Sequence, residues 1–167
     1  MKKEVIDLKY NENTSLLLKR DLGFLSKQGT YFISYKIKPL IAYNNSLLNK
    51  LNALKENKDK SGIYRWVNKI NNENYVGRSI NLSSRFRSYY SKKFLINRIL
   101  TKNSRIYRAL LFYDYYNFDL EILEYCDKEL IIEREQYYFD LLKPEYNILL
   151  NSKANYSSRF IKKLQGP

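Results

Sequence analysis

The sequence predicts an α+β domain whose elements follow the order β-β-α-α-β-α. Two segments rich in β-branched and aromatic residues, Gly62–Ile70 and Tyr75–Arg78, lie on either side of an Asn-rich turn at 71–74. Apolar and polar residues alternate over Phe118–Tyr125, which predicts a third strand. Helical patterns between and after these strands complete the order.

Two helices are expected between the second and third strands. Ser79 or Asn81 can cap a helix that runs to about Lys92, because both side chains can accept a hydrogen bond from the first helical turn. A second helix is expected over Arg105–Tyr113.

The last helix is expected over Lys128–Leu142, with Asp127 as its cap and Pro144 as its terminator. One face of this helix is apolar. Glu135 lies away from that face and can therefore take part in chemistry.

The chain divides into an N-terminal extension (1–60), a domain (61–150) and a basic tail (151–167). Within the extension, Asn44–Lys58 is expected to form an amphipathic helix, and the polar run Lys55–Ser61 to be a linker. Four leucines share one stripe of that helix, which favours core packing or self-association over reading DNA: Leu47, Leu48, Leu51 and Leu54.

Charge is strongly positive and unevenly distributed. The formal net charge is +13, so a polyanion such as nucleic acid is the expected partner. Residues 61–108 hold eleven Lys and Arg against a single acidic residue, whereas residues 109–150 hold three against ten. A basic half that binds phosphates, beside an acidic half that offers a carboxylate to a cation, suits a metal-assisted nuclease.

Two absences exclude several classes of protein. The chain has no histidine, and Cys126 is its one cysteine. Zinc fingers, Fe–S clusters, disulfides, Ser-His-Asp catalysis and Cys-His catalysis are therefore excluded. A general base must be Tyr, Lys, a carboxylate or metal-bound water.

No secretion signal or membrane span is expected. Charged residues interrupt the first apolar stretch, and Tyr31–Tyr43 is too short and too often broken to cross a bilayer. The abundance of Asn, Lys and Ile points to an AT-rich genome such as that of an organelle, a phage or a low-GC bacterium.

Five elements in order resemble the GIY-YIG nuclease superfamily over residues 62–148: Gly62-Ile63-Tyr64, Tyr75-Val76-Gly77, Arg85, Glu135 and Asn147. Within it, the chain looks most like homing endonucleases encoded by group I introns, particularly fungal mitochondrial ones. The resemblance implies a small three-stranded antiparallel sheet flanked by helices. It also implies hydrolysis of double-stranded DNA with one divalent metal ion, and a mitochondrial location.

The residues themselves support this chemistry. Arg85 and Tyr89 are four positions apart and share a helix face, so that Arg85 can clamp a phosphate through two hydrogen bonds. Glu135, alone among the candidates, is the expected metal ligand, because Mg²⁺ (or Mn²⁺) is commonly bound by one carboxylate together with phosphate oxygens and water. Glu133 points to a different helix face and is the less favoured choice.

By resemblance to the family, Tyr64 helps to deprotonate the attacking water, Tyr75 orients the water or the phosphate, and Asn147 braces the site. A tyrosine has a pKa of about 10, so Tyr64 needs nearby cations to act as a base. Two positions depart from related sequences: some homing members carry histidine at Tyr89, and many relatives carry glycine at Asp114.

Further basic residues are expected to contact the DNA backbone: Arg78, Arg87, Lys92, Lys93, Arg98 and Arg105. Three functions remain open. The first is a site-specific homing endonuclease, the second is a catalytically weak nucleic-acid-binding intron factor, and the third is a structure-specific repair or recombination nuclease.

Overall fold

The computed structural model describes residues 18–21 and 34–148, which fall into two compact units, Met1–Pro39 and Leu40–Pro167. In the first unit, β1 (Leu18–Asp21) pairs antiparallel with β2 (Ser34–Ile37). The predicted basic tail, 151–167, lies outside the described residues.

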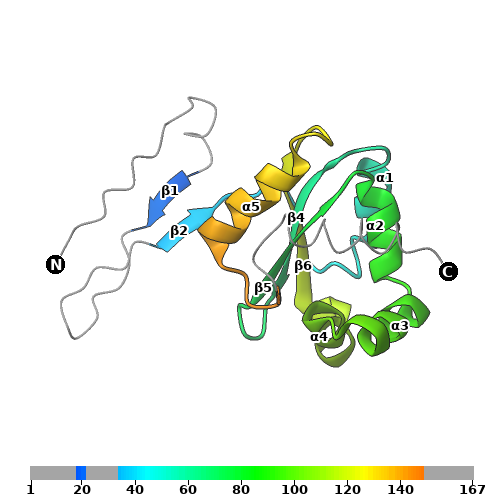
Figure 1. Cartoon of the computed structure of the whole chain (residues 1–167). Coiled ribbons are helices and arrows are strands. Elements are labelled where there is room, and N and C mark those ends of the chain that lie inside the picture. The colour runs from blue at the N-terminus through cyan, green and yellow to red at the C-terminus, as the bar shows by residue number, and fades with distance from the viewer. Residues whose placement is uncertain (1–17, 22–33, 149–167) are drawn as a thin grey trace, which may run out of the picture. The chain divides into compact units, whose positions relative to one another are not determined.

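The second unit is built on a four-stranded antiparallel sheet in the order β3-β6-β4-β5. Its strands are β3 (Ile41–Tyr43), β4 (Gly62–Asn68), β5 (Asn74–Ser79) and β6 (Phe118–Tyr125). The helix α5 (Ile131–Leu142) covers one face (Figure 1). The predicted α+β class is thereby confirmed, although the sheet has four strands rather than the three that were expected.

The opposite face of the sheet carries the remaining helices (Figure 1). They are α1 (Lys50–Glu56), α2 (Leu82–Tyr89), α3 (Lys92–Lys102) and α4 (Arg105–Tyr113), followed by a short 3₁₀ turn, η2 (Tyr115–Asn117). The expected order β-β-α-α-β-α did not include α3. This helix is basic and only weakly amphipathic, so its sequence gives little helical pattern.

The added strand, β3, comes from the predicted N-terminal extension. It pairs with β6, and the Leu40 backbone N–H also donates to the Ile122 carbonyl at 2.8 Å. The second compact unit therefore begins at Leu40, whereas the predicted domain boundary lies at residue 60. A three-residue strand is too short to show a period in the sequence.

Residues 44–61 differ from the expected helix and linker. The helix α1 is shorter than predicted, and its one buried residue is Ala53 rather than a leucine. Leu48 and Leu51 are 74% and 76% exposed, and of the four leucines in the stripe Leu54 packs against the core. Asn57, in the predicted linker, is fully buried and donates to the Tyr43 hydroxyl and the Ala53 carbonyl.

Local signals set most helix ends. The Asn81 side chain accepts from the Ser84 backbone N–H, which confirms one of the two predicted caps of α2. The predicted cap of α5 is wrong: the helix begins at Ile131, and Asp127 accepts from Leu130 through its backbone carbonyl. The end of α5 before Pro144 agrees with the prediction.

Strand register places the motif residues on known faces. Tyr64 lies opposite Gly77 and Trp66 opposite Tyr75 in the β4–β5 pair. Because side chains alternate along a strand, these four residues face the same side of the sheet. Trp66 and Tyr64 are fully buried there, against a core that includes Phe86 of α2. The motif is thus part of the packing between the sheet and α2.

Gly62 lies where β4 and β6 approach each other closely. A Cβ at this position would lie 2.2 Å from the Glu124 carbonyl oxygen, a distance that a backbone contact cannot accommodate. The pairing register also shifts between Ile63 and Tyr64, as in a β-bulge. The first glycine of the motif is therefore required by the sheet.

Among the described residues, no helix is long and apolar enough to cross a membrane.

Candidate active site

Three predicted site residues, Tyr64, Arg85 and Tyr89, form one hydrogen-bonded cluster between β4 and α2, and Tyr75 of β5 packs beside it. The Tyr64 and Tyr89 hydroxyls lie 3.0 Å apart, and Arg85 Nε donates to the Tyr64 hydroxyl at 2.9 Å. An Arg85 Nη also donates to the Tyr89 hydroxyl at 3.4 Å, and the guanidinium carbon lies 4.9 Å from the centre of the Tyr89 ring. The ring of Tyr75 lies 6.4 Å from those of Tyr64 and Tyr89.

The helical spacing of Arg85 and Tyr89 brings both side chains to the same face of α2, as predicted. Phe86 meets the Tyr64 ring edge to face at 5.3 Å and fixes it against the helix. The guanidinium of Arg85 is consequently held by two hydroxyls and one ring, which orients its remaining donors.

Burial governs the ionisation of the tyrosines in this cluster. Tyr64 is fully buried, and loss of solvent raises the pKa of its hydroxyl far above the usual value, although the charge of Arg85 acts in the opposite direction. Burial likewise raises the pKa of Tyr89. Tyr64 is therefore neutral at ordinary pH in this arrangement, where its hydroxyl holds Arg85 in place.

Tyr107 of α4 joins the cluster, although the sequence did not single it out. Its ring lies 5.4 Å from that of Tyr89, and only 6% of the residue is exposed. Arg85 counteracts the rise in the pKa of Tyr107 that burial causes. The one available sequence signal was its position on the inward face of the predicted helix 105–113.

The candidate metal ligand, Glu135, lies on α5 and pairs with Arg78 of β5. The expectation that it lies away from the apolar face of the helix is wrong, because Glu135 is buried on the same face as Ile131 and Phe139, four positions before and after it. Side-chain exposure is 7% for Glu135 and 11% for Arg78, so the ion pair is largely desolvated. Because α5 and α2 cover opposite faces of the sheet, this pair and the Arg85 cluster come from opposite sides. Both belong to the β4–β5 end of the sheet, where β5 is the edge strand.

The donor set around Glu135 agrees with a metal that is held mainly by substrate. Among the described residues, no three His, Cys, Asp or Glu side chains are grouped closely enough to enclose an ion. A single carboxylate can hold Mg²⁺ when phosphate oxygens and water complete the octahedral shell. Glu135 would supply that carboxylate.

Asn147 binds the backbone of the edge strand β5. Its side-chain oxygen accepts from the Val76 backbone N–H, and its Nδ2 donates to the Val76 carbonyl, both at 2.9 Å. Glu145 binds the same strand one step earlier, where its carboxylate accepts from the backbone and side-chain nitrogens of Asn74. The segment after α5 thus replaces a neighbouring strand along part of β5.

The other predicted DNA-binding residues occupy different surroundings. Arg87, Lys92 and Lys93 are exposed on α2 and α3. Arg98 is half-buried, with its guanidinium 5.1 Å from the centre of the Phe94 ring. Arg105 is exposed on α4 and donates to the Glu145 carbonyl at 3.4 Å. Arg78 alone among these candidates is engaged with Glu135.

Replacing Gly77 by alanine is expected to displace the Tyr64 hydroxyl. A Cβ at Gly77 would lie 2.6 Å from that hydroxyl and its ring carbon, and Tyr64 has no room to move because Phe86 and Tyr89 enclose it. A misplacement of ~1 Å at a reacting centre can cost about 10²-fold in rate. Overpacking costs about 1–3 kcal/mol in stability.

Urea unfolding and single-turnover DNA cleavage of this variant would test both effects. Leu48→Ala, at an exposed residue of α1, provides the control. Wild-type cleavage by Gly77→Ala would contradict the role given to this close contact.

Comparison with known proteins finds similarity over the domain that holds these residues. The family model described as the GIY-YIG catalytic domain matches residues 60–147. A curated relative, UvrABC system protein C of Mycoplasma capricolum, is 31% identical over 98 residues, which cover 59% of this chain but 15% of the relative.

Two solved structures are also similar. One is a point mutant of the catalytic domain of intron endonuclease I-TevI, with 31% identity, a TM-score of 0.44 and coverage of 54% of this chain and 94% of that one. The other is the catalytic domain of homing endonuclease I-TevI, with 28% identity, a TM-score of 0.43 and coverage of 54% and 99%.

Proposed function

The chain belongs to the GIY-YIG nuclease family, and from this premise we propose that it is a site-specific endonuclease of the homing type, acting on double-stranded DNA. The observation that carries the proposal is the hydrogen-bonded cluster of Arg85, Tyr64 and Tyr89 in the same domain as Glu135. The net charge of +13 agrees with a polyanionic substrate.

In this reaction, Arg85 stabilises the negative charge that develops on the phosphate. Phosphodiester hydrolysis gathers negative charge on the oxygens around phosphorus, and a fixed guanidinium stabilises that charge without reorganising. Tyr64 and Tyr89 hold the guanidinium in place, and its other N–H groups would bind the phosphate. Tyr75, which is half-buried beside them, orients the water or the phosphate.

Nucleases of this family generally use a divalent metal ion, and we propose Mg²⁺, with Mn²⁺ as a substitute. Glu135 would hold it, and when bound the ion lowers the pKa of water and neutralises charge on the phosphate. In the structure, the Glu135 carboxylate is paired with Arg78.

The strongest support for general-base action by Tyr64 is its distance of 2.9 Å from Arg85. Its burial opposes that action, because the pKa of the hydroxyl is raised. A Tyr64→Phe variant distinguishes the two parts. If Tyr64 only positions Arg85, cleavage retains the pH dependence of the wild type at a lower rate.

Cleavage of a randomised DNA library tests the proposed function. Duplexes with a random 30-base-pair segment, incubated with the full chain and Mg²⁺, should yield cut products that share one sequence, and EDTA should abolish the cutting. Cutting without shared sequence would contradict site specificity. The residue composition supports an AT-rich genome as the source. We propose a mitochondrial one, and finding this reading frame inside a group I intron of such a genome would test that proposal.

A structure-specific repair nuclease is the second candidate. It is favoured by the similarity to UvrABC system protein C, of which this chain spans about 15% of the length. Equal cutting of branched junctions that differ in sequence, with little cutting of linear duplexes, would support this candidate over homing.

A further inference from the structure

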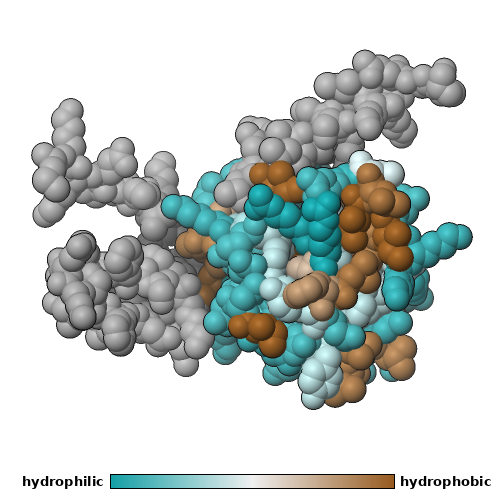
Figure 2. Space-filling model, turned by 90° about the horizontal axis from the view of Figure 1, so that it is seen from below, coloured by the Kyte–Doolittle hydropathy of each residue, from teal (hydrophilic) through white to brown (hydrophobic). Residues whose placement is uncertain are grey.

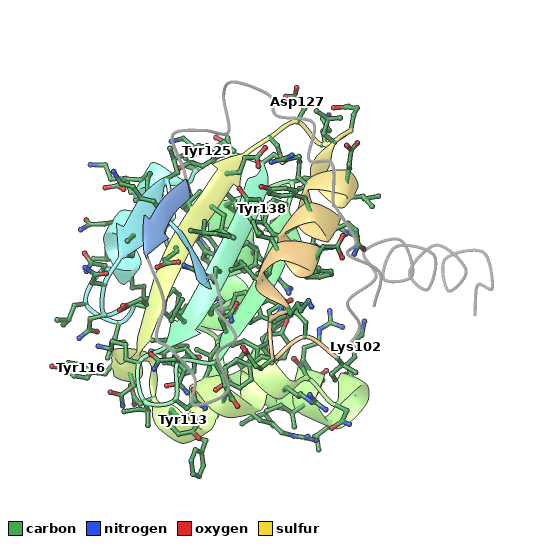
Figure 3. The ribbon with its side chains drawn as sticks, turned by 90° about the vertical axis from the view of Figure 1, so that its left-hand side faces the viewer. Lys102, Tyr113, Tyr116, Tyr125, Asp127 and Tyr138 are labelled. Atoms are coloured by element: carbon green, nitrogen blue, oxygen red, sulfur yellow. The ribbon has the colours of Figure 1, made fainter. Side chains whose placement is uncertain are left out.

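A cavity of about 410 Å³ lies beside α4, and none of its lining residues belongs to the Arg85 cluster. Its volume falls within the ~300–1,000 Å³ common for ligand pockets. The lining combines two arginines, two glutamates and aromatic rings: Glu73, Arg105, Arg108, Ala109, Phe112, Tyr113, Glu145 and Tyr146. In Figure 3, Tyr113 lies at the end of the sheet opposite to Tyr125 and Asp127.

Three of the lining residues form an outward stripe on α4. Arg105, Arg108 and Phe112 are three and four positions apart and therefore share one helix face. Both arginines are exposed, and Phe112 is 81% exposed, among the most exposed large hydrophobic residues of the described chain. The face of the molecule seen in Figure 2 shows hydrophobic side chains set among hydrophilic ones.

Two aromatic rings of the cavity contact each other. The Phe112 ring meets the Tyr113 ring edge to face, with 4.8 Å between their centres. Arg105 donates to the Glu145 carbonyl, and the Glu145 carboxylate is bound to Asn74. The cavity rim is consequently tied to the start of the edge strand β5.

This combination fits one nucleotide. An exposed aromatic ring beside two guanidinium groups is the arrangement that binds single-stranded nucleic acid, because the base stacks on the ring and the cations hold the phosphates. The carboxylates of Glu73 and Glu145 can accept from the amino groups of a base. A nucleotide uses all three kinds of group at once: the two guanidinium groups, the two carboxylates and the Phe112 ring. A protein partner would not need all of them at one ring.

The distance to the catalytic cluster agrees with a single DNA substrate. Glu73 lines the cavity, and Tyr75, two residues later, packs beside the cluster, which corresponds to ~7 Å of extended backbone. The same length covers about two nucleotide steps of B-DNA. A nucleotide in the cavity would therefore belong to the DNA that is cut.

We propose that the cavity of Arg105, Arg108, Phe112 and Tyr113 binds one unstacked nucleotide of the substrate, near the cut phosphate. The inference rests on the proposed endonuclease function and extends it, because it makes a distorted or unpaired position in the DNA part of what the protein recognises. Stacking on Phe112 offsets part of the energy needed to unstack the base.

Binding of two 20-base-pair duplexes tests this inference. One is fully paired and the other carries a single unpaired nucleotide, and EDTA prevents cutting. We expect the full chain to prefer the duplex with the unpaired nucleotide. Phe112→Ala should lower the affinity for that duplex by about 5- to 150-fold, which corresponds to the loss of ~1–3 kcal/mol of base–aromatic stacking. Its affinity for the paired duplex should stay within about twofold.

Two further variants make the result specific. Phe112→Trp should keep the preference, because it retains the stacking surface, and Leu48→Ala, at another exposed apolar residue, should leave both affinities unchanged. A wild-type chain without preference, or a Phe112→Ala variant that keeps it, would overturn the inference. If the inference is overturned, cleavage of paired DNA by Phe112→Ala would still support the proposed endonuclease function. The inference and the proposed function can therefore fail separately.

Discussion

Glutamine in place of Glu135 is expected to lower DNA cleavage by about 10³-fold or more, a loss typical of removing a charged group from a transition state. Glutamine keeps the shape of the side chain and can still accept a hydrogen bond from Arg78, but it removes the negative charge that a divalent metal needs. Single-turnover rates at saturating protein, in Mg²⁺ and in Mn²⁺, measure the loss.

Glu133→Gln is the matched control for this experiment. Glu133 lies on the same helix but is exposed, so its substitution should leave the rate within about twofold. Because removal of one partner from a buried ion pair can destabilise the fold by about 3–5 kcal/mol, urea unfolding of each variant must accompany the rates. A folded Glu135→Gln chain that cuts at the wild-type rate would refute the assignment of Glu135 as metal ligand.

The second large effect is expected for Arg85→Lys, which should reduce cleavage by about 10²- to 10³-fold even though the positive charge remains. Lysine has no planar fork, so it cannot bind Tyr64 and Tyr89 and at the same time offer two donors to a phosphate. The loss should appear in the maximal single-turnover rate more than in DNA affinity, because Arg85 acts on charge that develops during the reaction.

Arg87→Lys serves as control, since Arg87 is exposed on the same helix and a lysine can still contact a phosphate. Its rate and affinity should remain close to those of the wild type. Equal effects of the two substitutions would show that α2 needs only positive charge. The special part given to the Tyr64–Arg85–Tyr89 cluster would then be wrong.

Elements with strong local signals agree with the sequence. The strand Phe118–Tyr125 and the helix Arg105–Tyr113 have the predicted bounds, because alternation and helical spacing are clear over eight or nine residues. The strand β3 depends on pairing with β6, which lies nearly eighty residues later in the chain. No local pattern could reveal it, and the same holds for the burial of Asn57.

The candidate site shows the same division. Motif spacing identified Tyr64, Tyr75, Arg85 and Tyr89, and the structure brings these four together. Tyr107 could not be found in this way, because it reaches the cluster only when α4 packs beside α2. Sequence reasoning also did not pair Glu135 with Arg78, whereas in the structure Arg78 of β5 forms an ion pair with Glu135 of α5.

The strand β3 has a practical consequence for dissecting the protein. It closes one side of β6, through the Leu40 N–H and the pairs from Ile41 to Tyr43. A fragment trimmed to the segment that the family model matches, residues 60–147, would leave the backbone groups of β6 open along an eight-residue edge. Open edges of this kind pair with other chains and promote aggregation. The smallest fragment that keeps the sheet closed therefore starts at Leu40.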